Sequence, residues 1–187
     1  LISQISVMNR LFILLSFLMG VIVLASNYLV QFPFKLFGLE EILTYGAFSY
    51  PISFLITDLA NRSYGKIIAR KIVYIGFTVG ILFSLVAFFY DLISIRIAVG
   101  SGTAFIVAQL LDVKIFDKLR RNKWFVAPLT SSFVSSIVDT FLFFSISFYG
   151  TDINWITLSF GDLVVKIFVA LLMLIPFRLL LGVVKAS

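Results

Sequence analysis

The sequence predicts an all-α integral membrane protein with six transmembrane helices. Hydrophobic residues make up 61% of the chain and charged residues only 13%, whereas a soluble domain carries about 25% charged residues. Six apolar segments approach the roughly 20 residues that a helix needs to cross a bilayer core of about 30 Å. Linkers and low-complexity tracts are absent, so we expect residues 1–187 to form a single transmembrane domain.

The first three expected spans lie in the N-terminal half of the chain. Residues 11–30 form a long, almost uninterrupted apolar run. The second span, at residues 43–59, is weaker because Gly46 and Pro51 interrupt it and both residues disfavour a continuous helix. The third span covers residues 72–90 and is again strongly apolar.

The last three expected spans fill the C-terminal half. They cover residues 97–116, 125–148 and 156–181, and the last is long enough to cross the bilayer at a tilt. Trp124 and Trp155 stand at span edges, where tryptophan commonly marks the interface between lipid and water.

The distribution of basic residues predicts the orientation. Arg10 precedes the first span, Lys185 follows the last, and two connections are basic: Arg62, Lys66, Arg70 and Lys71 lie between spans two and three, and Lys118, Arg120, Arg121 and Lys123 between spans four and five. The alternate connections hold only Lys35 and Arg96, together with Glu40, Glu41, Asp91 and Asp152. Because basic connections stay in the cytoplasm, we expect both termini to be cytoplasmic.

The composition also excludes several function classes. The formal net charge of +6 does not indicate nucleic-acid binding, because the basic residues lie in short connections between apolar segments. Cysteine and histidine are both absent, which excludes disulfides, haem ligation and thiolate or imidazole metal sites. We therefore expect no metal site and no cofactor.

An intramembrane protease is the main enzymatic alternative, and the sequence argues against it. Serine proteases of this kind need a histidine, which the chain lacks. Aspartyl proteases pair a Tyr-Asp with a Gly-x-Gly-Asp motif. Tyr90 and Asp91 lie at a span edge, and Ser159 stands where the first glycine before Asp162 is needed. We therefore expect no enzymatic activity.

Small residues recur every four positions on three of the spans. The sets are Gly76, Gly80 and Ser84; Gly100, Ala104 and Ala108; and Ser131 with Ser135 and Ser132 with Ser136. Small residues at this spacing let helix backbones approach closely. Packing between helices of this chain is the favoured interpretation, and docking onto a partner subunit is the alternative.

Ionisable residues deep inside apolar segments are the strongest functional signal. A charged side chain at the middle of a membrane helix costs about 2.5–3.5 kcal/mol, so such residues commonly face a polar cavity. With the expected orientation, Asn27, Asp139, Asp162 and Lys166 lie in the outer half or middle of the membrane. The inner half holds Asp58, Gln109 and Asp112. Together they predict a substrate or ion path.

Each of these residues also has a structural interpretation. Asp162 and Lys166 are four residues apart on one helix face and can simply neutralise each other. Asp58 can pair with Arg62, one turn away. Asp139 has no basic residue within a turn of its own helix, so its partner must come from another helix, water or a substrate.

Motifs distributed along the chain carry a resemblance to a known family. They are, in order, Ser26-Asn27-Tyr28-Leu29-Val30-Gln31, Gly46-Ala47-Phe48-Ser49-Tyr50-Pro51, Thr57-Asp58-Leu59, Arg96-Ile97-Ala98, Gln109-Leu110-Leu111-Asp112-Val113, Ala127-Pro128, Asp139-Thr140, and finally Asp162 and Lys166. This ordered set resembles the VUT/YhhQ family of queuosine precursor transporters across nearly the whole chain.

The resemblance implies a bacterial inner-membrane protein, similar in arrangement to the substrate-binding subunits of energy-coupling-factor transporters. It implies uptake of 7-cyano-7-deazaguanine, and of the 7-aminomethyl form as a further candidate, for salvage into tRNA modification. The matching site positions are Asn27, Ser49, Asp58, Arg96, Gln109, Asp112, Asp139, Asp162 and Lys166. Tyr50, beside Pro51, offers an aromatic face for a flat ring.

The residue types suit such a ligand. A carboxylate can accept two N–H groups of a guanine-like edge, and lysine or amide side chains can donate to its carbonyl. Our hypothesis is that Gln109, Asp112, Asp139 and Lys166 contact the base, while Asn27 and Arg96 lie at the outer entrance. A subunit of an energy-coupling-factor complex with an ATPase module, and a structural or channel-like protein, are the alternatives. The sequence leaves homo-oligomerisation and the driving force open.

Overall fold

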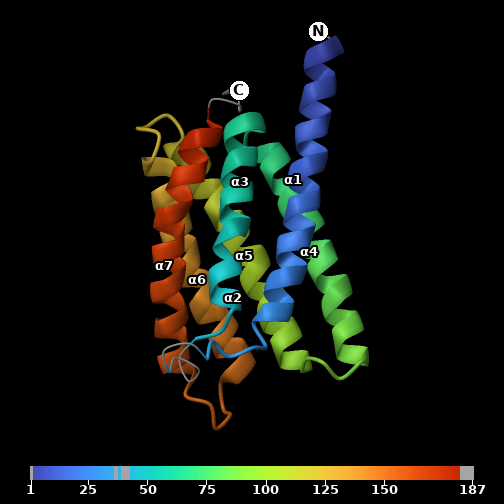
Figure 1. Cartoon of the computed structure of the whole chain (residues 1–187), viewed down its shortest axis with the longest axis vertical. Helices are drawn as coiled ribbons and strands as arrows, with labels where there is room; N and C mark the ends of the chain where they lie inside the picture. The colour runs from blue at the N-terminus through green and yellow to red at the C-terminus, as the bar shows by residue number, and fades with distance from the viewer. Residues whose placement is uncertain (1, 36–37, 39–42, 182–187) are drawn as a thin grey trace.

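The structure is a computed structural model that describes residues 2–35, 38 and 43–181. Within these residues the chain forms helices that pack side by side into one elongated bundle (Figure 1). Glu40, Glu41 and Lys185, which we used to predict the orientation, lie outside the described residues.

Five helices are long and apolar enough to cross a membrane, which is the arrangement of a multi-pass membrane protein. They are α1 (Ile2–Leu29), α4 (Lys66–Phe89), α5 (Ile95–Leu119), α6 (Val126–Phe148) and α7 (Trp155–Leu180). In α1 the spanning part is Arg10–Leu29. Five of the six spans that we predicted thus correspond to these helices.

The remaining span is broken into two pieces, α2 (Gly46–Ser49) and α3 (Pro51–Tyr64), with Tyr50 between them. Pro51 begins α3, where its missing N–H leaves no helical hydrogen bond unmade. α3 has 14 residues, and at 1.5 Å per residue it is too short to cross a bilayer alone. It contacts every other helix of the described chain, so it lies at the centre of the bundle.

Our prediction of a basic loop between the second and third spans is wrong. α3 and α4 are joined by Gly65 alone, whose φ of 75° is one that glycine adopts without strain. Arg62 therefore lies in α3, and Lys66 in α4. The helix extends past the apolar segment because Asn61 is buried and donates to the Val113 carbonyl of α5 at 2.9 Å.

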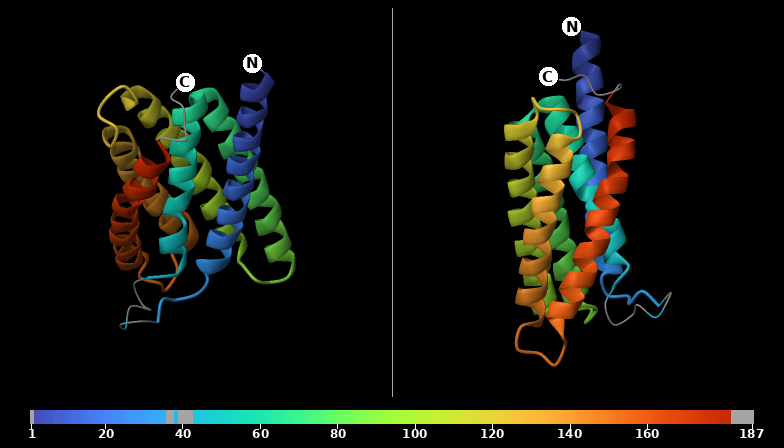
Figure 2. Two further views of the ribbon diagram at one scale, coloured as in Figure 1. Left: turned by 45° about the horizontal axis from the view of Figure 1, so that its top comes forward. Right: turned by 90° about the vertical axis from the view of Figure 1, so that its left-hand side faces the viewer.

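The two ends of the bundle differ in charge. The start of α1, the α3–α4 turn, the α5–α6 connection and the end of α7 lie at one end, which we call the basic end (Figures 1 and 2). The α4–α5 and α6–α7 connections lie at the opposite end, which we call the far end. At the basic end Asp117 pairs with Lys66 at 3.4 Å and with Arg120 at 3.8 Å, which ties α5 to α4.

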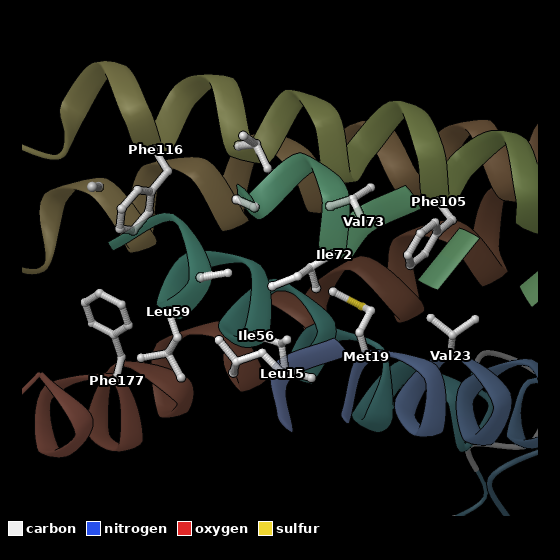
Figure 3. Close-up of a cluster of buried hydrophobic side chains, with 14 residues drawn as sticks. Leu15, Met19, Val23, Ile56, Leu59, Ile72, Val73, Phe105, Phe116 and Phe177 are labelled. Carbon is white, nitrogen blue, oxygen red and sulfur yellow. The ribbon is translucent and has the colours of Figure 1, made fainter. Parts of the chain in front are cut away.

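The larger apolar cluster draws its side chains mainly from α1, α3, α4, α5 and α7, with Ala127 from the start of α6 (Figure 3). The labelled side chains are Leu15, Met19, Val23, Ile56, Leu59, Ile72, Val73, Phe105, Phe116 and Phe177. A smaller cluster of Ala104, Phe143 and Phe144 joins α5 to α6. Because bilayer lipid is as apolar as these side chains, close packing rather than water exclusion holds such helices together.

The small-residue positions face helices of the same chain. A Cβ on Gly76 would lie 2.5 Å from Met19 Cγ of α1, and one on Gly80 would lie 2.9 Å from Val23 Cγ1. On α5, the backbone of Gly100 packs directly against Ser147 of α6. The α5–α6 pair is the most extensive helix contact of the described chain, so these residues serve packing within the bundle.

Candidate functional site

Lys166 of α7 lies between two carboxylates inside the bundle. Its Nζ is 2.6 Å from Asp162 Oδ2, one turn earlier on α7, and 2.8 Å from Asp139 Oδ2 on α6. Thr140 joins the cluster: its Oγ1 donates to Asp162 Oδ2 at 2.9 Å and lies 3.2 Å from Lys166 Nζ. The pairing within α7 that we predicted is therefore present, and α6 supplies the partner of Asp139.

The cluster is almost sealed from its surroundings. Asp139, Asp162 and Lys166 are 3%, 5% and 4% exposed. Two carboxylates and one ammonium leave one net negative charge when all three are ionised. Buried ions of this kind are tolerated only when each is paired and hydrogen-bonded, and a surplus negative charge favours a ligand that brings donors or positive charge.

Tyr50 lies at the break between α2 and α3, and its side chain covers one side of the cluster of Asp139, Asp162 and Lys166. The ring lies under Lys166, with Nζ 4.9 Å from the ring centroid, close enough for a cation–π interaction. Its buried hydroxyl lies near the Asp139 carboxyl. Edge contacts with Phe54 at 5.8 Å and Phe105 at 6.3 Å between centroids fix the ring. The interruption of the second span thus places an aromatic side chain at the charged cluster.

The opposite wall comes from α1, α2 and α5. Ser26 Oγ and Ser49 Oγ are 2.9 Å apart and join the end of α1 to α2. Ser101 on α5 donates to Asn27 Oδ1 at 2.9 Å, which leaves the two N–H donors of the Asn27 amide for other partners. These contacts present short polar groups across from the lysine and its carboxylates.

A pocket lies between these two walls, in the half of the bundle nearer the far end. Its cavity volume is about 40 Å³, so a ligand as large as a base can enter only when lining side chains move aside. Its polar lining includes Ser26, Asn27, Ser101, Tyr50, Asp139, Asp162 and Lys166, and its apolar lining includes Val30, Ala104 and Phe143. Aromatic and apolar walls with a few convergent polar groups are typical of sites for small flat molecules.

A second polar group begins one turn along α3. Gln109 of α5 donates to Ser53 Oγ at 2.7 Å and accepts from Thr57 Oγ1 at 2.6 Å. Ser53 in turn donates to the Tyr50 carbonyl at 2.7 Å. Gln109 is 0% exposed, so its amide is used inside the protein and does not line the pocket.

Asp58 and Asp112 form a third polar group, nearer the basic end. They are 2% and 0% exposed, and their carboxyls are within hydrogen-bonding reach of each other. Ser131 and Ser132 of α6 donate to the two oxygens of Asp58 at 3.3 and 3.5 Å. The predicted pairing of Asp58 with Arg62 is absent, because Arg62 donates instead to the Arg120 carbonyl at 2.7 Å.

Comparison with known proteins gives the chain a family. A family model described as "putative vitamin uptake transporter" matches residues 44–181, which include α2 to α7. The chain belongs to this family. The description of the family is that of a transporter.

Curated relatives of this family member cover most of its length. A "probable queuosine precursor transporter" of Haemophilus influenzae is 36% identical over 90% of this chain and 85% of its own. The "queuosine precursor transporter" of Escherichia coli is 32% identical over 83% of this chain and 79% of its own. A "probable queuosine precursor transporter" of Bacillus subtilis is 29% identical. No solved structure matches the chain.

The structure separates the residues that we predicted as one site. Asn27, Tyr50, Asp139, Asp162 and Lys166 meet in the pocket of this family member. Ser49 lies behind its wall and contacts Ser26. Gln109 and Asp112 lie deeper in the bundle, as described above. Arg96 is exposed at the far end and donates to the Tyr149 carbonyl at 2.5 Å, outside the pocket lining.

Sequence reasoning did not select several residues of the pocket. Ser101 stands eleven positions before Asp112 on α5, a spacing of three helical turns, so the polar face of that helix could have revealed it. Thr140, which supports the pocket from behind through its hydrogen bond to Asp162, directly follows Asp139. Val30, Gly46 and Phe143 carry no polar signal and appear only through the packing. Among the described residues, no group of three or more potential metal ligands comes together.

Proposed function

We propose that this membrane protein imports a queuosine precursor, a 7-deazaguanine base, and binds it in the pocket at Lys166. The observation that carries the proposal is the cluster of Asp139, Asp162 and Lys166, buried beside Tyr50 in the wall of the pocket. The names of its relatives point to the same class of substrate.

The contacts within the cluster suggest which carboxylate receives the base. Asp162 accepts from Thr140 as well as from Lys166, so its hydrogen bonds are satisfied without a ligand. Asp139 depends on Lys166 and the Tyr50 hydroxyl nearby. We therefore assign Asp139 to the ring N–H and the exocyclic amine of the base, and Lys166 to its carbonyl, since a carboxylate can accept two parallel N–H bonds.

The two further walls of the pocket fit the rest of the ligand. The Tyr50 ring and Phe143 can cover the faces of a flat heterocycle, and stacking of a base on an aromatic ring contributes about 1–3 kcal/mol. The free N–H donors of Asn27 suit an unprotonated ring nitrogen. We propose 7-cyano-7-deazaguanine as the substrate and the 7-aminomethyl form, whose positive charge suits the surplus negative charge of the cluster, as a further candidate.

For the arrangement in the membrane, we propose six crossings, with α2 and α3 together making the second. This places the basic end, which includes the start of α1 and the end of α7, in the cytoplasm of a bacterial inner membrane. The pocket then lies in the outer half of the protein, which suits capture of a substrate from outside.

Uptake is tested in cells that can neither synthesise the precursor nor import it. Expression of the wild-type chain should restore queuosine in tRNA when 7-cyano-7-deazaguanine is supplied outside, measured by mass spectrometry of tRNA nucleosides. The Asp139→Asn variant should reach the membrane but restore much less queuosine at limiting precursor, whereas Asp117→Asn, a matched change outside the pocket, should behave as wild type. Absence of queuosine with wild-type protein present in the membrane would refute the proposed function.

A further inference from the structure

The Asp58–Asp112 pair is the most unusual polar feature outside the pocket. Asp58 belongs to α3 and Asp112 to α5, and their carboxyls face each other within hydrogen-bonding reach in the interior of the bundle. No N–H or O–H group of the described chain makes a well-formed hydrogen bond to either oxygen of Asp112. Among the described residues, the donors to Asp58 are the Ser131 and Ser132 hydroxyls, through long contacts.

Basic residues near this end are engaged elsewhere. Arg62 binds the Arg120 carbonyl, Lys66 binds Asp117, and Arg178 lies over the Trp124 ring at 5.0 Å. Arg120 pairs with Asp117 at 3.8 Å. The other lysines and arginines of α4, of the second half of α5 and of the α5–α6 connection are exposed: Arg70, Lys71, Lys114, Lys118, Arg121 and Lys123.

The side chains packed around the pair from the remaining elements carry no charge. α4 presents Ala69, Ile72 and Val73 to the core, and α7 presents Met173, Leu174 and Phe177 near Asp58. In the part of the chain that the structure describes, no cation neutralises the two carboxyls.

Two carboxyl groups in this arrangement require a proton. Like charges in contact, away from water, cannot both be ionised, and such pairs hold one proton between them. A protonated Asp58 carboxyl can donate to Asp112, whose oxygens have no well-formed hydrogen bond within the described chain. The proton is therefore the ligand that completes this pair.

The pair is linked to the pocket through α3. This helix begins next to Tyr50 in the pocket and carries Ser53 in its first turn and the adjacent residues Thr57 and Asp58 one turn later. Ser53 and Thr57 are both hydrogen-bonded to Gln109, which lies three residues before Asp112 on α5. A movement of α3 relative to α5 would change the pocket wall and the carboxyl pair together.

A small cavity also lies beside the pair. It touches Asp58, Ser132, Leu174 and Phe177 between α3, α6 and α7, and its volume is about 10 Å³, close to the space that one water molecule needs. Its lining shares no residue with the lining of the lysine pocket, so the pair lies apart from the substrate site.

We propose that Asp58 and Asp112 form a proton-binding site, distinct from the substrate pocket, whose loading and release drive the movement of α3 during transport. The coupling to transport rests on the proposed function. Protonated, the pair holds α3 against α5. Loss of the proton leaves two negative charges that repel each other, so release into the less acidic cytoplasm would loosen α3.

Infrared spectroscopy tests the proton itself, whatever the substrate. Purified wild-type protein at neutral pH should show the carbonyl stretching band of a protonated carboxyl, and the band should disappear on raising the pH. It should be lost in Asp112→Asn and kept in Asp117→Asn, a matched change on the same helix, and in Asp139→Asn. Absence of the band in the wild type, or its persistence in both Asp58→Asn and Asp112→Asn, would overturn the proposal.

Proteoliposomes test the coupling. With 7-cyano-7-deazaguanine, wild-type protein should accumulate the base when the outside is acidic, with acidification of the lumen reported by a trapped pH-sensitive dye. Asp112→Asn should still bind the base and exchange it at equal concentrations, which also shows that it is folded, but should lose accumulation driven by the gradient.

The results separate this proposal from the proposed function. Wild-type exchange that is unaffected by the gradient would overturn the coupling while supporting deazaguanine transport. Absence of both binding and exchange, with the infrared band present, would overturn the proposed function and support the proton site.

Discussion

Lys166 Nζ on α7 lies 2.8 Å from Asp139 Oδ2 on α6. The two residues are 27 positions apart in the sequence, so the packing of the two helices creates this ion pair. Because Lys166 also binds Asp162 of its own helix at 2.6 Å, one cation holds two carboxylates in the pocket. A ligand that offers N–H donors can replace the lysine at one of them.

Asparagine at position 139 should weaken binding of the base without unfolding the protein. Lys166 keeps Asp162 as its partner, so no buried charge is left alone. Loss of hydrogen bonds to an ionised carboxylate costs about 1.5–3 kcal/mol, or roughly 10- to 100-fold in affinity. Titration of purified Asp139→Asn with 7-cyano-7-deazaguanine measures this, and wild-type affinity would remove Asp139 from the site.

Replacing the lysine should have a different effect, on stability. In Lys166→Met, two carboxylates remain buried without their cation, which should destabilise the fold by about 3–5 kcal/mol. The triple variant Lys166→Met, Asp139→Asn, Asp162→Asn removes all three charges and should recover much of that loss. Unfolding in detergent measures both variants. Equal instability of the single and triple variants would show that the three charges do not act together.

Two glycines of α5, Gly100 and Gly102, provide a matched test of how closely this helix packs against its neighbours. A Cβ on Gly100 would collide with Ser147 of α6 and lie 3.2 Å from the Phe143 carbonyl oxygen, whereas one on Gly102 would be 3.6 Å from its nearest neighbour, Ile81 Cδ1. Gly100→Ala should therefore destabilise the protein by about 1–3 kcal/mol. Gly102→Ala should be neutral or stabilising, by up to about 1 kcal/mol, since alanine favours helix. Unfolding midpoints that shift equally would contradict this packing of α5 on α6.

The chain contains no cysteine, so its orientation can be measured with single introduced cysteines. Asn122 lies in the α5–α6 connection at the basic end and Thr151 in the α6–α7 connection at the far end, and both are exposed. In intact cells, a membrane-impermeant maleimide should label Thr151→Cys. Asn122→Cys should react only after the membrane is opened. The reverse pattern would place the basic end outside.

The hydropathy pattern predicted the five long helices correctly, because a helix that crosses a bilayer must be long and apolar. It failed around residues 60–71, where Asn61 and Ser63 look like a connection but lie buried in α3. Their polar groups are satisfied by the Val113 carbonyl of α5 and the Leu59 carbonyl. A hydropathy window cannot register such partners, because they come from the tertiary packing.

The candidate site was predictable in its residue types but not in its grouping. Buried charge pointed to Asp112, Asp139, Asp162 and Lys166 as one polar path, and the structure divides them between the pocket and the carboxyl pair with Asp58. Depth along each helix can be counted from the sequence. The rotation of one helix against another depends on side-chain packing, and that rotation decides which polar residues meet.

A structure of the protein with 7-cyano-7-deazaguanine tests the central claim most directly. The base should lie in the pocket beside Tyr50, with its N–H edge on Asp139 and its carbonyl within hydrogen-bonding distance of Lys166 Nζ, which has turned from Asp139. Lys166 should retain its contact with Asp162. A base bound elsewhere, with the Lys166–Asp139 contact intact, would contradict the account.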